Sequence, residues 1–140
     1  MPTSKRTMTD IAGEIRAGLQ ANRHYVDIDG VYGDQVVIWH AHDDTETTIE
    51  TPQLMTGARR ALEGINKTLP DLHNEDVRVV VADDSTVLAT FRQTGTLPDG
   101  VAWANPMCLL YRVEGGLLVR VDEYFHHGHV ERLSEYNGHS

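Results

Sequence analysis

The sequence is poor in cysteine and has no long apolar run, and each shortage excludes a class of protein. Cys108 is the only cysteine, so an intrachain disulfide and a zinc site built from several cysteines are both excluded. Its neighbours Met107, Leu109 and Leu110 are apolar, which predicts a packed thiol rather than an activated one. No apolar run approaches the roughly 20 residues that a membrane-spanning helix needs.

Basic residues are also scarce, with 12 Lys and Arg against 21 Asp and Glu and a formal net charge of -9. Such a surface repels phosphate backbones, and no segment concentrates basic residues, so we expect no nucleic-acid binding. A glycine-rich phosphate loop and a nucleophile elbow are missing as well. Residues 1–9 are polar and lack the apolar stretch of a signal peptide, so we expect a cytoplasmic protein that does not bind membranes.

The helical patterns lie in the first half of the chain. Ile11, Ile15 and Leu19 recur every four residues and predict an amphipathic helix over 9–22, capped by Thr9 or Asp10. A short helical stretch is expected over 24–33 and a longer helix over 52–69. We expect one domain over 9–133, between a disordered tail, 1–8, and a C-terminal tail, 134–140.

The second half of the chain has the pattern of strands. Strands are expected over 36–40, 77–82, 86–96, 101–113 and 117–125, with a loop or ragged edge strand over 42–51 and a short helix near 130–133. Helices followed by a meander of antiparallel strands favour an α+β fold, in which the helices cover one face of a curved sheet.

The strand expected over 117–125 contains the clearest chemical signal. Its odd positions are apolar except for Glu123, and alternation places them on one interior face. A three-residue turn at 114–116 would set Met107 opposite Glu123 and Asn105 opposite Phe125. Burial would raise the pKa of the Glu123 carboxyl and suit it to proton transfer. The alternative is that Glu123 lies at the mouth of the sheet, solvated or paired with an arginine.

His40 is a second candidate for proton transfer, because imidazole titrates near a pH of about 6.5. It shares one face of its strand with Val36 and Ile38, while Val37 and Trp39 form the other. Both faces are apolar, so periodicity does not decide which one points inward. A structural histidine at a strand end is the alternative.

Histidine-rich segments at 126–129 and 40–44 suggest metal binding, but neither has the ligand spacing of a known metal site. The first follows the last strand and has no fixed geometry that would hold a ligand set. We therefore expect no metal and no organic cofactor.

The order of elements and five local phrases resemble the nuclear transport factor 2-like superfamily, and within it the SnoaL-like group of polyketide cyclases and isomerase relatives. The phrases are residues 31–40, 55–62, 95–100, 111–118 and 122–125. Together they extend over about residues 9 to 133. The resemblance implies a cone-shaped fold, in which a curved mixed sheet wraps around three helices and encloses a deep apolar pocket. It also implies a homodimer through the outer sheet face, which would carry Ala102, Ala104, Cys108 and Leu110.

The resemblance assigns roles to both candidates. His40 falls where ketosteroid isomerases carry their proton-shuttling aspartate, which favours its inward orientation. Glu123 falls where relatives of limonene epoxide hydrolase carry an acidic residue. The hydrolases' Arg-x-Asp pair is replaced by Gln93 and Gly95, and the isomerases' oxyanion-hole aspartate by Leu109. Both of those specific reactions are therefore in doubt.

The resulting hypothesis is a cofactor-independent cyclase, isomerase or dehydratase that acts on a small hydrophobic carbonyl compound. His40 would abstract a proton, and Glu123, if protonated, or Asn105 would support the enolate oxygen. A non-catalytic ligand-binding or dimerisation domain is the alternative, and an epoxide hydrolase-like enzyme is a further one. The residues expected to contact the substrate are Ile15, Leu19, Trp103, Asn105, Met107, Tyr111 and Phe125.

Overall fold

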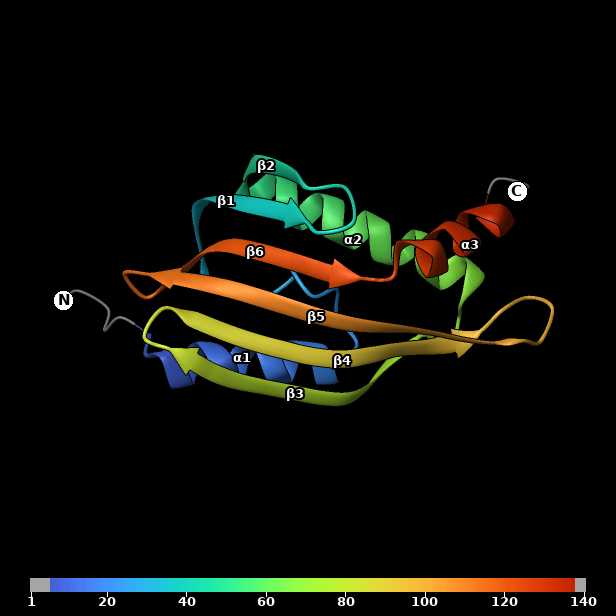
Figure 1. Cartoon of the computed structure of the whole chain (residues 1–140), viewed down its shortest axis with the longest axis horizontal. Helices are drawn as coiled ribbons and strands as arrows, with labels where there is room; N and C mark the ends of the chain where they lie inside the picture. The colour runs from blue at the N-terminus through green and yellow to red at the C-terminus, as the bar shows by residue number, and fades with distance from the viewer. Residues whose placement is uncertain (1–5, 138–140) are drawn as a thin grey trace.

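The computed structural model describes residues 6–137, which form a six-stranded sheet and three helices (Figure 1). The elements in chain order are α1 (Met8–Gln20), β1 (Tyr32–His40), β2 (Thr45–Glu50), α2 (Thr51–Thr68), β3 (His73–Asp83), β4 (Thr86–Thr96), β5 (Ala102–Glu114), β6 (Leu117–Phe125) and α3 (His127–Asn137). The predicted α+β class is confirmed. The expected bounds hold at β4 and β6, whereas β1 and β3 begin four residues earlier than expected.

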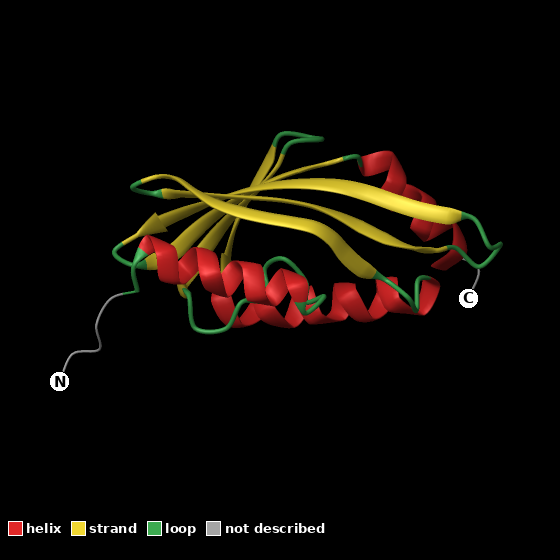
Figure 2. Ribbon diagram, turned by 90° about the horizontal axis from the view of Figure 1, so that it is seen from below, coloured by secondary structure: helices red, strands yellow, loops and turns green. Residues whose placement is uncertain are grey.

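The sheet has the strand order β2-β1-β6-β5-β4-β3. The β1–β6 pair is parallel and every other pair is antiparallel, so the sheet is mixed. Figure 2 shows the curved sheet with α1 and α2 side by side on one face, and α3 at one end. No helix within 6–137 is both long and apolar enough to cross a membrane.

Helix α1 packs its apolar stripe into the core, where Ile11, Ile15 and Leu19 are fully buried. Its N-cap is Thr7, not Thr9 or Asp10 as expected. The Thr7 hydroxyl accepts a hydrogen bond from the Asp10 amide, and the Asp10 carboxylate accepts one from the Thr7 amide. This reciprocal capping box explains the earlier start of the helix. The cap thus lies within the expected tail, 1–8, whose first five residues are outside the described residues.

The helical stretch expected over 24–33 is wrong, because residues 24–31 form turns and irregular backbone and Tyr32 begins β1. Asn22, just before the segment, and Gly30, within it, adopt left-handed φ angles of 60° and 75°, which a right-handed helix does not accommodate. The apolar spacing that suggested a helix, at Tyr25, Ile28 and Val31 or Tyr32, instead reflects packing into the core, where Ile28, Val31 and Tyr32 are buried and Tyr25 packs against them. A turn segment satisfies the same burial pattern when tertiary contacts hold it.

Two tertiary contacts hold this segment in place. The buried carboxylate of Asp27 accepts hydrogen bonds from Nε and Nη2 of Arg59 on α2, at 3.3 and 3.1 Å. On the other side, the buried Tyr111 hydroxyl on β5 donates to the Tyr25 carbonyl oxygen at 2.7 Å. The turns are therefore tied to both layers of the fold.

The β5–β6 hairpin differs in register from the expectation. Leu109, not Met107, lies opposite Glu123, and Met107, not Asn105, lies opposite Phe125. A two-residue turn at Gly115 and Gly116, both with positive φ, replaces the expected three-residue turn.

The rest of the shift comes from a bulge near the start of β6. Val113 pairs with Leu118 and Arg112 with Arg120, which leaves Val119 as the extra residue. The bulge reverses the alternation, so Leu118 is buried and Leu117 is exposed, contrary to the expected odd-numbered face. Beyond the bulge Val121 and Glu123 face inward as expected.

The outer face of β5 carries the residues expected at a dimer interface, Ala102, Ala104, Cys108 and Leu110, which are exposed or half-buried. Burial raises the pKa of the Cys108 thiol, which agrees with a packed rather than an activated cysteine. The homodimer itself stays a prediction.

The Asp27 contact is expected to stabilise the fold. Asp27→Asn should lower the free energy of unfolding by about 1 kcal/mol, because it weakens charged hydrogen bonds to half-exposed arginines. Asp29→Asn is the matched control, since the exposed Asp29 contacts the same arginines, Arg23 and Arg59. Urea denaturation at pH 7 measures both variants. Equal losses in the two would contradict the role of the buried carboxylate.

Candidate functional site

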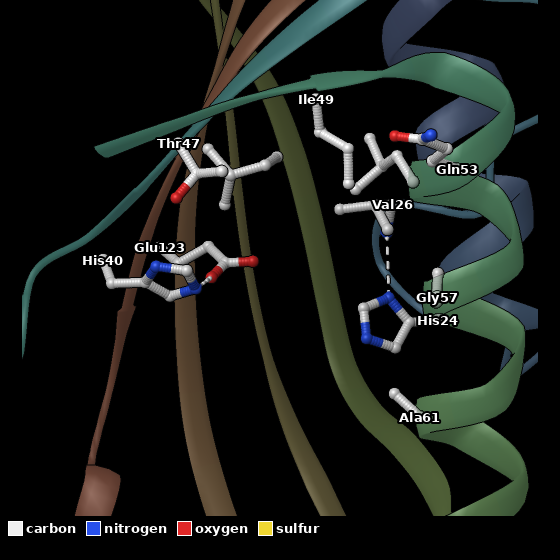
Figure 3. Close-up of a pocket in the computed structure, with 12 residues that line it drawn as sticks. His24, Val26, His40, Thr47, Ile49, Gln53, Gly57, Ala61 and Glu123 are labelled. Carbon is white, nitrogen blue, oxygen red and sulfur yellow. Dashed lines mark hydrogen bonds and ion pairs between the residues drawn. The ribbon is translucent and has the colours of Figure 1, made fainter. Parts of the chain in front are cut away.

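A cavity of about 290 Å³ lies between α2 and the β1–β6 part of the sheet (Figure 3). Its wall is mostly apolar, with polar groups from β1, β2, α2, β6 and the turns that precede β1. The residues that line it are His24, Val26, Ile38, His40, Thr47, Ile49, Gln53, Leu54, Gly57, Ala58, Ala61 and Glu123. Its volume equals that of about ten water molecules and lies near the lower end of small-molecule sites.

The cavity exists because α2 presents small residues to the sheet. Gly57, Ala58 and Ala61 fall on one helical face and line the space. A Cβ atom at Gly57 would meet no other atom within 4 Å, so the space beside the helix is open there. Larger side chains at these positions would fill it, as Leu and Ile do elsewhere in the core.

His40 and Glu123 meet at the sheet side of this cavity. The parallel pairing of β1 with β6 makes them direct Cα partners, so their side chains project from neighbouring strands on one face. His40 Nε2 lies 2.8 Å from Glu123 Oε2 (Figure 3). The Glu123 side chain is 4% exposed and the His40 side chain 33%. The inward orientation of His40, which periodicity left undecided, follows the buried Val36 and Ile38.

The Glu123 carboxyl is held in an unfavourable environment for its charge. Burial raises its pKa above the ordinary 4.5, while a hydrogen bond from Tyr25 and the charge of His40 lower it by less. Despite the short contact, Oε2 receives no well-aligned hydrogen bond from any described residue. The site therefore contains a buried carboxyl with a raised pKa, one oxygen of which lacks a hydrogen-bond partner among the described residues.

His24 is a third ionisable residue of the cavity, and sequence reasoning missed it. Its Nδ1 accepts a hydrogen bond from the Val26 amide at 3.3 Å, and its ring stacks on Tyr25 at 4.2 Å. Burial lowers its pKa to about 4, against a smaller opposing effect of Asp27. The ring is therefore neutral at pH 7 and carries its proton on Nε2. No periodic signal marked His24, because it lies in turns.

The seven residues expected to contact substrate lie elsewhere. Ile15, Leu19, Met107 and Tyr111 belong to the main core. The expectation treated the inward face of the β5–β6 hairpin as a pocket wall. In the structure α1 covers β3 and β4 and fills this side, and the open space lies between α2 and the β1–β6 part of the sheet.

The other three expected contacts also lie outside the cavity wall. Trp103 packs in a small separate cluster with Leu69, Leu97 and Leu133. Asn105 is buried and donates from Nδ2 to Met107 Sδ, while its Oδ1 has no hydrogen-bond partner among the described residues. Phe125 packs against the edge of the main core.

The histidines near the last strand form ring stacks. His42 stacks on His127 at 4.0 Å, and His126 on His129 at 4.2 Å. Within residues 6–137, no group of three or more His, Cys, Asp or Glu side chains is arranged to hold a metal ion. The absence of a metal or cofactor from the reaction stays a prediction.

Comparison with solved structures identifies the same fold in several bacterial proteins. A candidate polyketide cyclase of Pseudomonas putida KT2440 is 15% identical with a TM-score of 0.63, covering 91% of this chain and 97% of its own. A candidate isomerase of Bacillus subtilis is 17% identical with a TM-score of 0.61, covering 89% and 92%.

A protein of Catenulispora acidiphila DSM 44928 with a ketosteroid isomerase-like fold is 14% identical with a TM-score of 0.58, covering 84% and 86%. These low identities show the fold alone. No curated protein sequence matches the chain. The sequence model of the SnoaL-like domain family, however, matches residues 16–121, which are most of the chain. The chain therefore belongs to the SnoaL-like family.

Proposed function

We propose that the chain is an acid/base enzyme that needs no metal or organic cofactor and acts on a small hydrophobic carbonyl compound. The observation that carries the proposal is the His40–Glu123 pair, a proton acceptor and a buried carboxyl 2.8 Å apart at the wall of an apolar cavity. Titratable groups placed together in an apolar pocket are typical of catalytic sites. The solved structures described as a cyclase and an isomerase support the same reaction class.

In the proposed mechanism Glu123 positions His40, which is the base. The ionised carboxylate, 2.8 Å from His40 Nε2 but not aligned as a hydrogen bond in this structure, would favour the His40 tautomer that carries its proton on Nε2 once substrate binding aligns the pair. In that tautomer Nδ1 accepts a proton from the carbon next to the substrate carbonyl. The electron pair of the broken C–H bond moves into the carbonyl group and forms an enolate. The carboxylate then stabilises the imidazolium beside it.

The enolate has three balanced outcomes, all without an oxidant or reductant. Where the enolate is conjugated with a C=C bond, return of the proton to the γ-carbon shifts that double bond and gives isomerisation. Attack on a second carbonyl carbon of the same molecule forms a C–C bond, and the imidazolium protonates the resulting alkoxide, which is an aldol cyclisation. Departure of a hydroxyl from the β-carbon, protonated by the imidazolium, releases water, forms a C=C bond and gives dehydration.

His40→Ala should abolish proton abstraction. Exchange of the α-protons of 2-tetralone in D₂O, followed by ¹H NMR, measures this step without knowledge of the natural substrate. We expect a loss of at least about 100-fold, the usual contribution of a general base. His73→Ala, an exposed histidine hydrogen-bonded to Glu75 and outside the cavity wall, is the control. Unchanged exchange in His40→Ala would exclude His40 as the base, and binding of ketones without exchange by the wild type would favour the ligand-binding alternative.

The raised pKa of Glu123 predicts a pH-dependent stability difference. Between the ordinary pKa and the raised one, the unfolded chain has lost the proton that the folded chain keeps, so wild-type stability falls as pH rises through this window. Glu123→Gln lacks this titration. Its stability relative to wild type should therefore increase from pH 4 to pH 7 in urea denaturation. A constant difference between the two proteins would contradict the desolvated carboxyl.

Filling the cavity should remove binding and leave the fold intact. Ala61→Leu introduces a good helix former into the cavity wall, and Asn66→Leu places the same side chain on the same helix at a position outside that wall. We expect Ala61→Leu to lose 2-tetralone binding by calorimetry, while Asn66→Leu binds like wild type. Equal binding by both variants would place the ligand elsewhere.

A further inference from the structure

We propose that His24 donates a hydrogen bond from Nε2 to the carbonyl oxygen of the substrate, and to the enolate oxygen that this carbonyl becomes. This inference rests on the proposed function and adds an electrophilic residue to it. It also fixes the direction in which the substrate binds. Its basis is the placement of His24 on the cavity wall, on the opposite side from the His40–Glu123 pair (Figure 3).

The hydrogen bond to the backbone determines which nitrogen carries the proton. Since Nδ1 of His24 accepts from the Val26 amide, its lone pair is occupied and the proton of the neutral ring lies on Nε2. The low pKa of the ring, caused by burial, keeps it in this neutral form. His24 thus has one group to offer a ligand, an N–H donor, and cannot serve as a second base in the cavity.

The segment around His24 is held rigidly enough for this role. Asp27 binds Arg59 of α2, and the Tyr25 carbonyl oxygen accepts from the buried Tyr111 hydroxyl. The His24 ring also stacks on the Tyr25 ring at 4.2 Å. A donor fixed in advance stabilises developing negative charge more effectively than one that must reorganise. The buried Tyr111 thereby contributes to the site from outside the cavity.

The two sides of the cavity consequently differ in chemistry, with a base on the sheet side and a hydrogen-bond donor on the opposite side. A ligand that bridges it would present its acidic C–H bond to His40 at the sheet and its carbonyl oxygen to His24 beside α2. Leu54, Ile49 and Ile38 would contact the apolar remainder. This arrangement selects a compact apolar ketone that carries a hydrogen on its α-carbon. It disfavours carboxylates, because the Glu123 carboxylate would repel them.

Two amide variants separate the donor from the shape of the segment. In His24→Asn the side-chain oxygen reaches the position of Nδ1 and can still accept from the Val26 amide, but no donor reaches the position of Nε2. In His24→Gln the amide nitrogen reaches the position of Nε2 and keeps a donor there. Thermal unfolding of each variant checks that the fold persists.

The direct readout is the infrared carbonyl stretch of bound ¹³C=O-labelled 2-tetralone, which shifts to lower frequency when the oxygen accepts a hydrogen bond. We expect the lowered frequency in wild type and His24→Gln, and its loss in His24→Asn. Exchange of the α-protons should fall by about 100-fold or more in His24→Asn and by less than about 10-fold in His24→Gln, in line with removal of a single oxyanion donor.

Identical carbonyl frequencies in wild type and His24→Asn with ligand bound would overturn the proposal, as would equal losses of exchange in the two variants. If the wild type catalyses no exchange but shows a frequency shift that depends on His24, the donor role is supported while the proposed function fails. Exchange that depends on His40 but not on His24 gives the opposite result, in which the function stands and this inference fails.

Discussion

The parallel pairing of β1 with β6 is the constraint on which the candidate site depends. It pairs β1 and β6, the first and last strands in chain order. It thereby makes His40 and Glu123 direct neighbours, although 83 positions separate them in sequence. A buried carboxyl costs free energy unless it is paired or protonated. The fold accepts this cost at Glu123, which is 4% exposed, and it partly offsets the cost with His40 and Tyr25. Functional sites are where such local conflicts are expected.

The remaining parts of the site depend on how the helices cover this pair. Helix α1 closes its half of the sheet with large aliphatic residues, whereas α2 presents Gly57, Ala58 and Ala61 and leaves a cavity. The turns between α1 and β1 then close one side, tied to α2 through Asp27 and to β5 through Tyr111. The difference between a filled core and a binding site is therefore a difference of a few side-chain volumes on one helix face.

Several features could be predicted from the sequence because they are local. The stripe of Ile11, Ile15 and Leu19 identified α1, and alternation in β6 singled out Glu123 as a charge on an inward face. The family resemblance, carried by phrases such as residues 31–40, predicted the fold and the inward orientation of His40. The solvated or arginine-paired alternative for Glu123 does not hold, since its neighbours are His40 and Tyr25.

Other features could not be predicted because they depend on tertiary contacts. The bulge at Val119 reversed the face of Leu117, and no composition signal marks it. His24 acquires its role from the Val26 amide, Arg59 and Tyr111, which come from three distinct parts of the fold. The cavity wall was misplaced for the same reason, because the packing of α1 and α2 decides which inward face remains open.

The central claim is that Glu123 is a buried carboxyl with a raised pKa beside His40. The most direct test is a ¹³C NMR titration of the protein with labelled glutamate, in which the Glu123 side-chain resonance is assigned by its absence from Glu123→Gln. The account predicts a titration midpoint above 4.5, the ordinary value for glutamate. A midpoint at or below 4.5 would show a well-solvated or strongly ion-paired carboxylate and would contradict the account.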